Sequence, residues 1–322
     1  MRRKVMGWMA AILGLAVTNA VEAGNIQVWA MAGAGNGNLF RIDEPSDTVS
    51  FIGAIKDPLT GDVGSGWSTD AITPDGTLYF LRRNQATDHI YSLNSNNIQV
   101  TAGVITNVQA VASTGLGGNL DGLTGGPDGN LYFTAYDNNV AGNVRNGLFR
   151  YNLVGANTGT VDFVGTFANN AGPSGVNSFY TDLSFDPMTG DLVGTGINST
   201  GAFIPWRLHN NQVVGQTNQS FTYVNAFAGW NGLSDGLAYN RDTGDLYASS
   251  DTGGVYRVDR NTGAILNVLA GTNSAFGGQI GTDLAILPID QVATPEPATL
   301  VSAGIAGLIG LGAFLRRRRR SA

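Results

Sequence analysis

One element recurs five times along the chain, and it constrains the fold more than any other feature of the sequence. Each copy places an aspartate among small and apolar residues at the start of a short predicted strand. The aspartates lie 51, 61, 53 and 48 residues apart: Asp70, Asp121, Asp182, Asp235 and Asp283. A repeat of about 50 residues predicts a structure built from similar units that pack against one another.

The repeated unit predicts four short strands. Four copies continue into a turn that contains Asp-Gly or Thr-Gly and then into a second strand, as in residues 70–80 and 235–247. These pairs mark hairpins because glycine tolerates the positive φ that tight turns require. Third strands are predicted at residues 88–93, 147–151, 203–209 and 254–259, and fourth strands at 160–167 and 264–269. Four strands per unit is the pattern of a β-propeller blade.

The two ends of the repeat region fit together as one unit. The fifth copy stops after its first strand, at Leu287, whereas residues 26–55 begin out of phase and match a second, third and fourth strand. Pairing the two ends closes the ring and removes open sheet edges. We therefore predict an all-β fold over residues 24–290, a β-propeller of five four-stranded blades closed by pairing N- and C-terminal strands. A β-sandwich also has many short strands, but it does not explain five similar units.

The start of the chain predicts export. Met1-Arg2-Arg3-Lys4 precedes an apolar run at residues 5–17, and small residues precede Gly24. A positive start, a short apolar run and small residues at the cleavage point are typical of a secretory signal peptide, here residues 1–23. Arg2-Arg3 also suggests twin-arginine export, but the flanking residues fit such a signal poorly.

The end of the chain has three parts in order. Residues 291–297 form a linker with the motif Pro295-Glu296-Pro297, and residues 298–315 form an apolar run. As a helix, these 18 residues would extend about 27 Å, enough to cross a hydrocarbon core. The basic residues that follow predict a cytoplasmic tail at residues 316–322. They are Arg316, Arg317, Arg318, Arg319 and Arg320.

These three parts resemble the PEP-CTERM sorting signal of Gram-negative bacteria that make exopolysaccharide. In that family an exosortase, a membrane cysteine protease-transpeptidase, processes the protein near the Pro-Glu-Pro motif. The resemblance covers about the last 30 residues. It implies the export machinery and an exosortase as partners, transient anchoring by the helix, and delivery to the cell surface or extracellular matrix. An ordinary tail anchor is the alternative, and the resemblance implies nothing about the domain's activity. The strand-turn-strand copies resemble those of propellers from exported bacterial proteins.

The composition of the predicted domain excludes several classes of function. Without the two ends, 10 Lys and Arg residues face 22 Asp and Glu residues, for a net charge near −12. A domain this acidic repels phosphate backbones, so nucleic acid is not an expected partner. The chain has no cysteine, which excludes thiolate metal sites and cysteine nucleophiles. Excess carboxylates suit calcium, which binds oxygen ligands.

The repeated aspartates have two readings. In a ring of blades, Asp70, Asp121, Asp182, Asp235 and Asp283 occupy equivalent positions. If they converge on the axis, they predict a calcium site or a ligand contact, because like charges at close range need a cation or protons. Alternatively, each carboxylate accepts backbone N–H bonds at the start of its strand.

Aromatic residues precede several of these aspartates. Trp67, Tyr180, Trp230 and Phe276 are the ligand-binding candidates. If exposed, they form a ring of stacking platforms of the kind that sugars prefer. If buried, they pack blade against blade.

The sequence contains no His-Glu-x-x-His motif and no phosphate-binding glycine loop, and it offers little support for catalysis. The leading hypothesis is a non-enzymatic surface or matrix protein whose propeller binds carbohydrate, such as exopolysaccharide, or another matrix component. The alternatives are a calcium-dependent hydrolase or lyase acting on extracellular polysaccharide, and a purely structural spacer.

Overall fold

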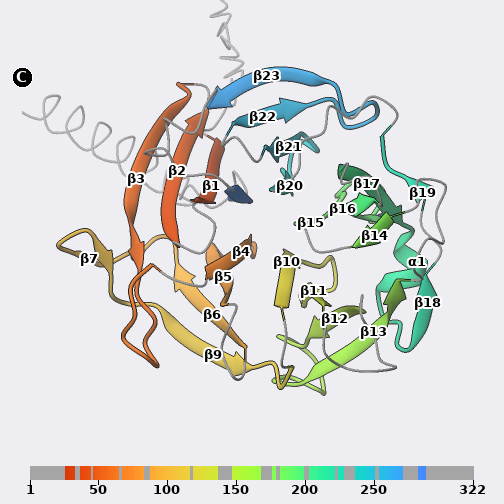
Figure 1. Cartoon of the computed structure of the whole chain (residues 1–322), viewed down its shortest axis with the longest axis horizontal. Coiled ribbons are helices and arrows are strands. Elements are labelled where there is room, and N and C mark those ends of the chain that lie inside the picture. The colour runs from red at the N-terminus through yellow and green to blue at the C-terminus, as the bar shows by residue number, and fades with distance from the viewer. Residues whose placement is uncertain are drawn as a thin grey trace, which may run out of the picture.

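Five β-sheets surround a common axis, and the fold is an all-β five-bladed β-propeller, as predicted (Figure 1). The computed structural model describes residues 26–32, 37–44, 46–64, 67–82, 88–116, 119–136, 147–167, 176–178, 182–198, 203–221, 224–227, 236–250, 254–270 and 282–287.

The blades are numbered along the chain, and their strands are given from the axis outward. Blade 1 contains β24 (Thr282–Leu287), β1 (Ile26–Ala32), β2 (Asn38–Glu44) and β3 (Thr48–Ile55). Blade 2 contains β4 (Trp67–Ile72), β5 (Thr77–Arg82), β6 (His89–Asn94) and β9 (Gln109–Ser113). Blade 3 contains β10 (Asn119–Gly125), β11 (Leu131–Tyr136), β12 (Gly147–Tyr151) and β13 (Val161–Phe167).

Blade 4 has a divided inner edge, because β14 (Val176–Ser178) and β15 (Leu183–Phe185) both pair with β16 (Leu192–Asn198). Its outer strands are β17 (Phe203–Leu208) and β19 (Val224–Asn225). Blade 5 contains β20 (Leu237–Tyr239), β21 (Leu246–Ser249), β22 (Val255–Val258) and β23 (Ile265–Ala270). Among the described residues, the four-residue α1 (Asn210–Val213) follows β17 and is the one helix beside the strands.

The predicted closure of the ring is confirmed in blade 1. Strand β24 pairs antiparallel with β1, and Val28 lies opposite Ile286. The innermost strand of this blade therefore comes from the C-terminal end of the propeller and the other three from its N-terminal end (Figure 1).

The core lies between the blades, because both faces of each blade are covered. In β1, Trp29 and Met31 pack in a cluster with residues of blade 2, whereas Val28 and Ala30 pack in a cluster with residues of blade 5. Side chains of a strand alternate between its two faces, so consecutive residues of β1 contact different blades. This explains why the strands are apolar at most positions rather than at every second one.

A six-residue turn with the pattern Asp/Asn-x-x-Thr-Gly-x recurs at residues 57–62, 186–191, 240–245 and 259–264. In each copy the side chain of the first residue accepts the N–H of the third, and the glycine N–H donates to the carbonyl of the first. The glycines have φ between +74° and +82°, a conformation that side chains with a Cβ rarely adopt. The Thr-Gly signal in the sequence therefore marks a real turn.

Two blades add a strand to the outer edge of the blade before them, which the sequence analysis did not predict. The hairpin of β7 (Val100–Thr101) and β8 (Val104–Ile105) from blade 2 pairs in parallel with β3 of blade 1. Strand β18 (Gln219–Phe221), which follows α1, pairs in parallel with β13 of blade 3. These additions cover edge strands that would otherwise be open to pairing with other chains.

Candidate functional site

The repeated aspartates lie at the inner edges of the blades. Asp70, Asp121 and Asp283 belong to the innermost strands β4, β10 and β24, and Asp182 directly precedes β15. Asp235 lies outside the described residues, and only Asp182 has a described side chain. The backbones of these four aspartates therefore lie in the innermost strands or directly before them.

The Asp182 carboxylate connects three blades. Its Oδ1 accepts the N–H of Leu183 at 2.9 Å, and its Oδ2 accepts the N–H groups of Leu237 in blade 5 at 3.0 Å and Leu284 in blade 1 at 3.3 Å. The residue is 1% exposed. Ser184 acts similarly, since its hydroxyl oxygen accepts the N–H of Tyr239 at 2.9 Å. Innermost strands have no neighbour on the axial side, so side-chain oxygens satisfy their buried N–H groups.

Within the described residues, no group of three or more His, Cys, Asp or Glu side chains is arranged to hold a metal ion. The side chains of Asp70, Asp121, Asp235 and Asp283 lie outside the described part of the chain. An axial calcium site therefore stays a prediction. For Asp182, the contacts are those of the alternative reading, in which the carboxylate accepts backbone N–H bonds.

The indole of Trp67 is buried, with 3% of the residue exposed. It packs edge-on against Phe80 and Tyr91, with ring centroids 6.2 and 4.8 Å away. Trp67 thus has the packing role rather than that of an exposed stacking platform. Tyr180, Trp230 and Phe276 lie outside the described residues, as do Pro295, Glu296, Pro297 and the arginines 316–320.

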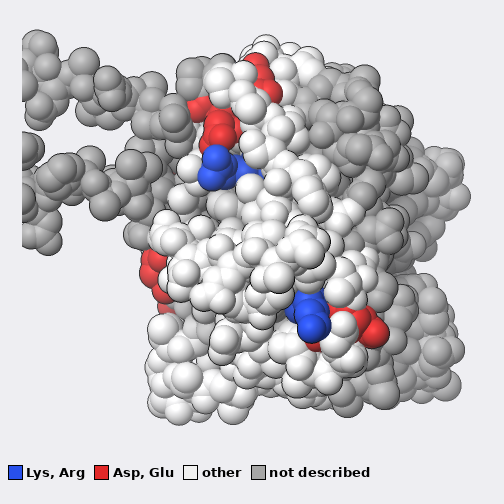
Figure 2. Space-filling view, turned by 90° about the vertical axis from the view of Figure 1, so that its left-hand side faces the viewer, with Lys and Arg blue, Asp and Glu red and all other residues white. Residues whose placement is uncertain are grey.

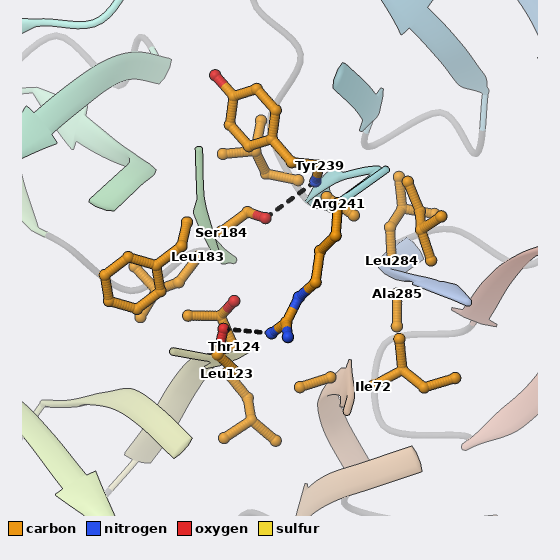
Figure 3. Close-up of a pocket in the computed structure, with 15 residues that line it drawn as sticks. Ile72, Leu123, Thr124, Leu183, Ser184, Tyr239, Arg241, Leu284 and Ala285 are labelled. Atoms are coloured by element: carbon orange, nitrogen blue, oxygen red, sulfur yellow. Dashed lines mark hydrogen bonds between the residues drawn. The ribbon is translucent and has the colours of Figure 1, made fainter. Parts of the chain in front are cut away.

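Where the described residues line it, the axis of the propeller contains only a small cavity. The five innermost strands line a cavity of about 30 Å³, shown in Figure 3, which is roughly the volume of one water molecule in the liquid. Each strand contributes apolar side chains, among them Ile72, Leu123, Leu183 and Leu284. Arg241 extends into this ring from the end of blade 5 and donates to the Gly125 carbonyl at 2.6 Å (Figure 3).

A larger pocket of about 450 Å³ lies beside this cavity, between the first turns of blades 2 and 3. This volume is within the range of small-molecule sites. We call it the turn pocket; its lining is Thr73, Pro74, Asp75, Tyr79, Gly125, Gly126, Pro127, Gly129, Asn130, Leu153, Val154 and Arg241. Apolar faces and a few polar groups therefore meet in one concavity.

Two polar residues of the turn pocket mainly hold the loops in place. Asp75 Oδ1 accepts the Thr73 hydroxyl at 2.6 Å and the Thr77 N–H at 3.1 Å. Partial burial opposes the charge on Asp75, but these hydrogen bonds outweigh it and lower the pKa of the carboxyl group. Asn130 Oδ1 accepts the N–H groups of Leu153 and Val154 at 3.0 and 3.2 Å.

Tyr79 and Arg241 contribute less than Asp75 and Asn130 to holding the loops in place. Burial, followed by the nearby carboxylate of Asp75, raises the pKa of Tyr79, so its phenol stays protonated and can donate a hydrogen bond. Burial also lowers the pKa of Arg241, an effect that neighbouring Asp242 partly offsets. The guanidinium remains charged at neutral pH, because an arginine pKa begins far above it.

Arg241 differs from the other arginines in the described ranges. Six of these seven lie within 4.0 Å of an Asp or Glu oxygen: Arg41, Arg82, Arg150, Arg207, Arg257 and Arg260. Figure 2, a view of the side of the molecule that carries β3, shows basic side chains close to acidic ones. Of the described arginines, only Arg241 has no such partner.

Arg241 and the turn pocket were not predicted from the sequence, because the predicted site residues were ones that repeat. Arg241 is instead a departure from the repeat. The corresponding turn positions in blades 2, 3 and 4 are prolines: Pro74, Pro127 and Pro187. Blade 5 has a charged residue at a turn position where these three blades have proline. That difference is the signal that could have identified Arg241.

No family model and no curated protein matches the chain. Among solved structures it is similar to TolB from Acinetobacter baumannii, with 16% identity, a TM-score of 0.44, and coverage of 78% of this chain and 53% of TolB. It thus spans about half of that protein. It is also similar to the PQQ-bound aldose sugar dehydrogenase of Streptomyces coelicolor (14% identity, TM-score 0.38, coverage of 80% and 84%).

A third similar structure is virginiamycin B lyase from Staphylococcus aureus, at 14% identity and a TM-score of 0.32, covering 78% of this chain and 71% of the lyase. These likenesses are too distant to carry a functional argument.

In the part of the chain that the structure describes, no helix is both long and apolar enough to cross a membrane. The predicted spanning segment, residues 298–315, lies outside that part.

Proposed function

We propose that this protein is exported, processed by an exosortase near Pro295-Glu296-Pro297, and delivered to the surface or extracellular matrix of a Gram-negative bacterium. There the propeller binds carbohydrate or another matrix component without catalysis. The two ends of the sequence support the sorting route, and the turn pocket supports the binding function.

The turn pocket is the observation that carries the binding proposal. It combines a volume of about 450 Å³ with apolar surface from Pro74, Pro127, Leu153 and Val154. Sugars present C–H faces beside hydroxyl groups, so they suit a site where apolar and hydrogen-bonding groups alternate. Tyr79 supplies a phenol for such contacts.

The binding test uses the full chain, purified in detergent, and a panel of bacterial exopolysaccharides and their oligosaccharides in isothermal titration calorimetry. Val154 lines the pocket and is 51% exposed, so Val154→Trp should fill the pocket and weaken binding at least tenfold. Val100 is similarly exposed at 45% but lies outside the pocket, so Val100→Trp is the matched control.

Equal binding by both variants would refute the turn pocket as the site. Saccharide turnover by the wild-type protein would instead support the hydrolase or lyase alternative, and absence of binding across the panel would support the spacer.

The sorting test is mass spectrometry of the surface-exposed protein from a host with an exosortase. We expect wild-type protein to lose its C-terminal segment near Pro297, and a Pro295→Ala, Pro297→Ala double variant to accumulate uncleaved in the membrane fraction. Thr294→Ala is the neighbouring control and should be processed normally. Uncleaved wild-type protein would favour the ordinary tail anchor.

A further inference from the structure

The four copies of the six-residue turn provide an internal comparison for Arg241. The turns at residues 186–191 and 240–245 join the first and second strands of blades 4 and 5. In the first, Asp186 Oδ1 accepts the Met188 N–H at 2.9 Å; in the second, Asn240 Oδ1 accepts the Asp242 N–H at 2.9 Å. The glycine N–H bonds to the carbonyl of the first residue are 2.7 and 2.8 Å long. The two backbones are therefore equivalent.

The second position of this turn is proline in two copies and arginine in two: Pro58, Pro187, Arg241 and Arg260. Proline needs no special explanation there, because it presets the φ of a turn. Arg260 has a structural role, since its Nη2 lies 2.6 Å from Asp186 Oδ1 and so connects blades 5 and 4. Arg241 has the same backbone setting, but no Asp or Glu oxygen of the described residues lies within 4.0 Å of its guanidinium, and Asp242 affects it only through its charge.

Within the described residues, the Arg241 guanidinium forms a hydrogen bond to one neutral carbonyl, at the edge of the turn pocket. Its Nη2 donates to the Gly125 carbonyl, and a Cβ added at Gly125 would lie only 2.6 Å from that nitrogen. The glycine therefore lets the guanidinium lie close to the backbone of β10. One hydrogen bond to a neutral carbonyl does not balance a partly desolvated cation, because guanidinium has five N–H donors and favours an anionic partner.

We propose that Arg241 binds the carboxylate of an acidic saccharide in the turn pocket, so that the ligand contains a uronic acid rather than only neutral sugars. This inference rests on the proposed saccharide-binding function. Arg241 lines the pocket together with Asp75, which stands on the blade 2 side. The ionised Asp75 repels a second carboxylate, so the pair orients the ligand with its acidic group toward the axis.

The test compares trigalacturonic acid with its methyl ester, which has the same sugar rings without the charges. Calorimetry with the full chain should show the acid binding about tenfold more tightly, the order expected for one charge-assisted hydrogen-bonded contact. The preference should decrease as salt is raised, because ions screen the attraction. Arg241→Gln should abolish the preference for the acid over the ester, because the amide carries no charge.

Two further variants separate recognition from folding. Arg241→Lys should keep part of the preference, since the charge remains but the planar fork is lost. Arg241→Pro places at this turn position the proline that blade 4 has, so the variant should fold and lack the preference. Arg260→Gln is the control: it breaks the ion pair with Asp186 and should lower the unfolding midpoint without changing the preference.

The outcomes distinguish this inference from the function on which it rests. Equal affinity for acid and ester, or a preference that survives Arg241→Gln, would overturn the role of Arg241 while leaving saccharide binding intact. If neither trimer nor any neutral saccharide of the panel binds, the proposed function and this inference both fail.

Discussion

At the scale of single residues, the structure explains why an aspartate suits the start of an inner strand. The inner edge of a propeller presents N–H groups toward an axis where no further strand can pair. Asp182 satisfies two such groups in neighbouring blades with one carboxylate oxygen. A short acidic side chain that accepts several N–H bonds is suited to this place, because unpaired buried donors are costly.

Asp182→Ala should therefore destabilise the whole propeller. It would leave the N–H groups of Leu237 and Leu284 buried without this acceptor, at about 1–3 kcal/mol each. We expect a lower thermal midpoint in calcium and in chelator alike, measured by circular dichroism. Asp182→Asn is the isosteric control and should lose less, since its amide oxygen still accepts. A loss that appears only in calcium would instead support the predicted axial metal site.

The repeat identified Asp182 from the sequence, but it could not identify the partners of Asp182. Leu237 and Leu284 lie 55 and 102 residues further along the chain, and closure of the ring alone brings them to the same place. The burial of Trp67 was unpredictable for a similar reason. Its exposure depends on Phe80, Tyr91 and the neighbouring blade rather than on the strand that contains it.

At the scale of elements, the strands were predictable and the added edge strands were not. A strand with a turn at each end has a local pattern, whereas β8 and β18 have two and three residues and form only against another blade. One signal was nevertheless present. The outer strands of blades 1, 2, 3 and 5 each contain a β-bulge. The residue next to the bulge is glycine in β3 and β13 (Gly53 and Gly165) and alanine in β9 and β23 (Ala112 and Ala270). The described part of β9 and β23 has no added strand.

The glycines allow the added strands to approach. A Cβ at Gly165 would lie 2.6 Å from the Gln219 carbonyl oxygen and 2.7 Å from the Phe221 ring. Gly165→Ala should therefore displace β18, cost about 1–3 kcal/mol of stability, and speed hydrogen exchange at residues 219–221. The reciprocal control, Ala112→Gly on the uncovered β9, should leave exchange at residues 219–221 unchanged. Unaltered exchange in Gly165→Ala would show that β18 does not depend on this close approach.

At the scale of the whole molecule, the ring and its closure followed from the phase of the repeat, but the candidate site did not. The turn pocket forms where the first turns of blades 2 and 3 meet Arg241 of blade 5. No local pattern relates these segments, because their proximity is a property of the closed ring. The repeated aspartates lie at the opposite end of the inner strands from the turn pocket. There the carboxylate of Asp182 connects blades through hydrogen bonds.

Because β24 closes the ring, we expect the whole propeller to depend on it for stability. A chain ending at residue 281 lacks β24, which pairs with β1 over residues 27–32 and supplies Leu284, Ala285, Ile286 and Leu287 to the inter-blade clusters. The ring would then have an open inner edge on β1 and an unfilled apolar seam between blades 1 and 5, both of which favour aggregation. We expect this chain to lose its cooperative thermal transition and to elute as aggregates in size-exclusion chromatography. A chain ending at residue 290 retains β24 and should unfold cooperatively as a monomer-sized species. Cooperative unfolding of the shorter chain would mean that four blades and an incomplete fifth are stable without closure, and that β24 is not what holds the ring together.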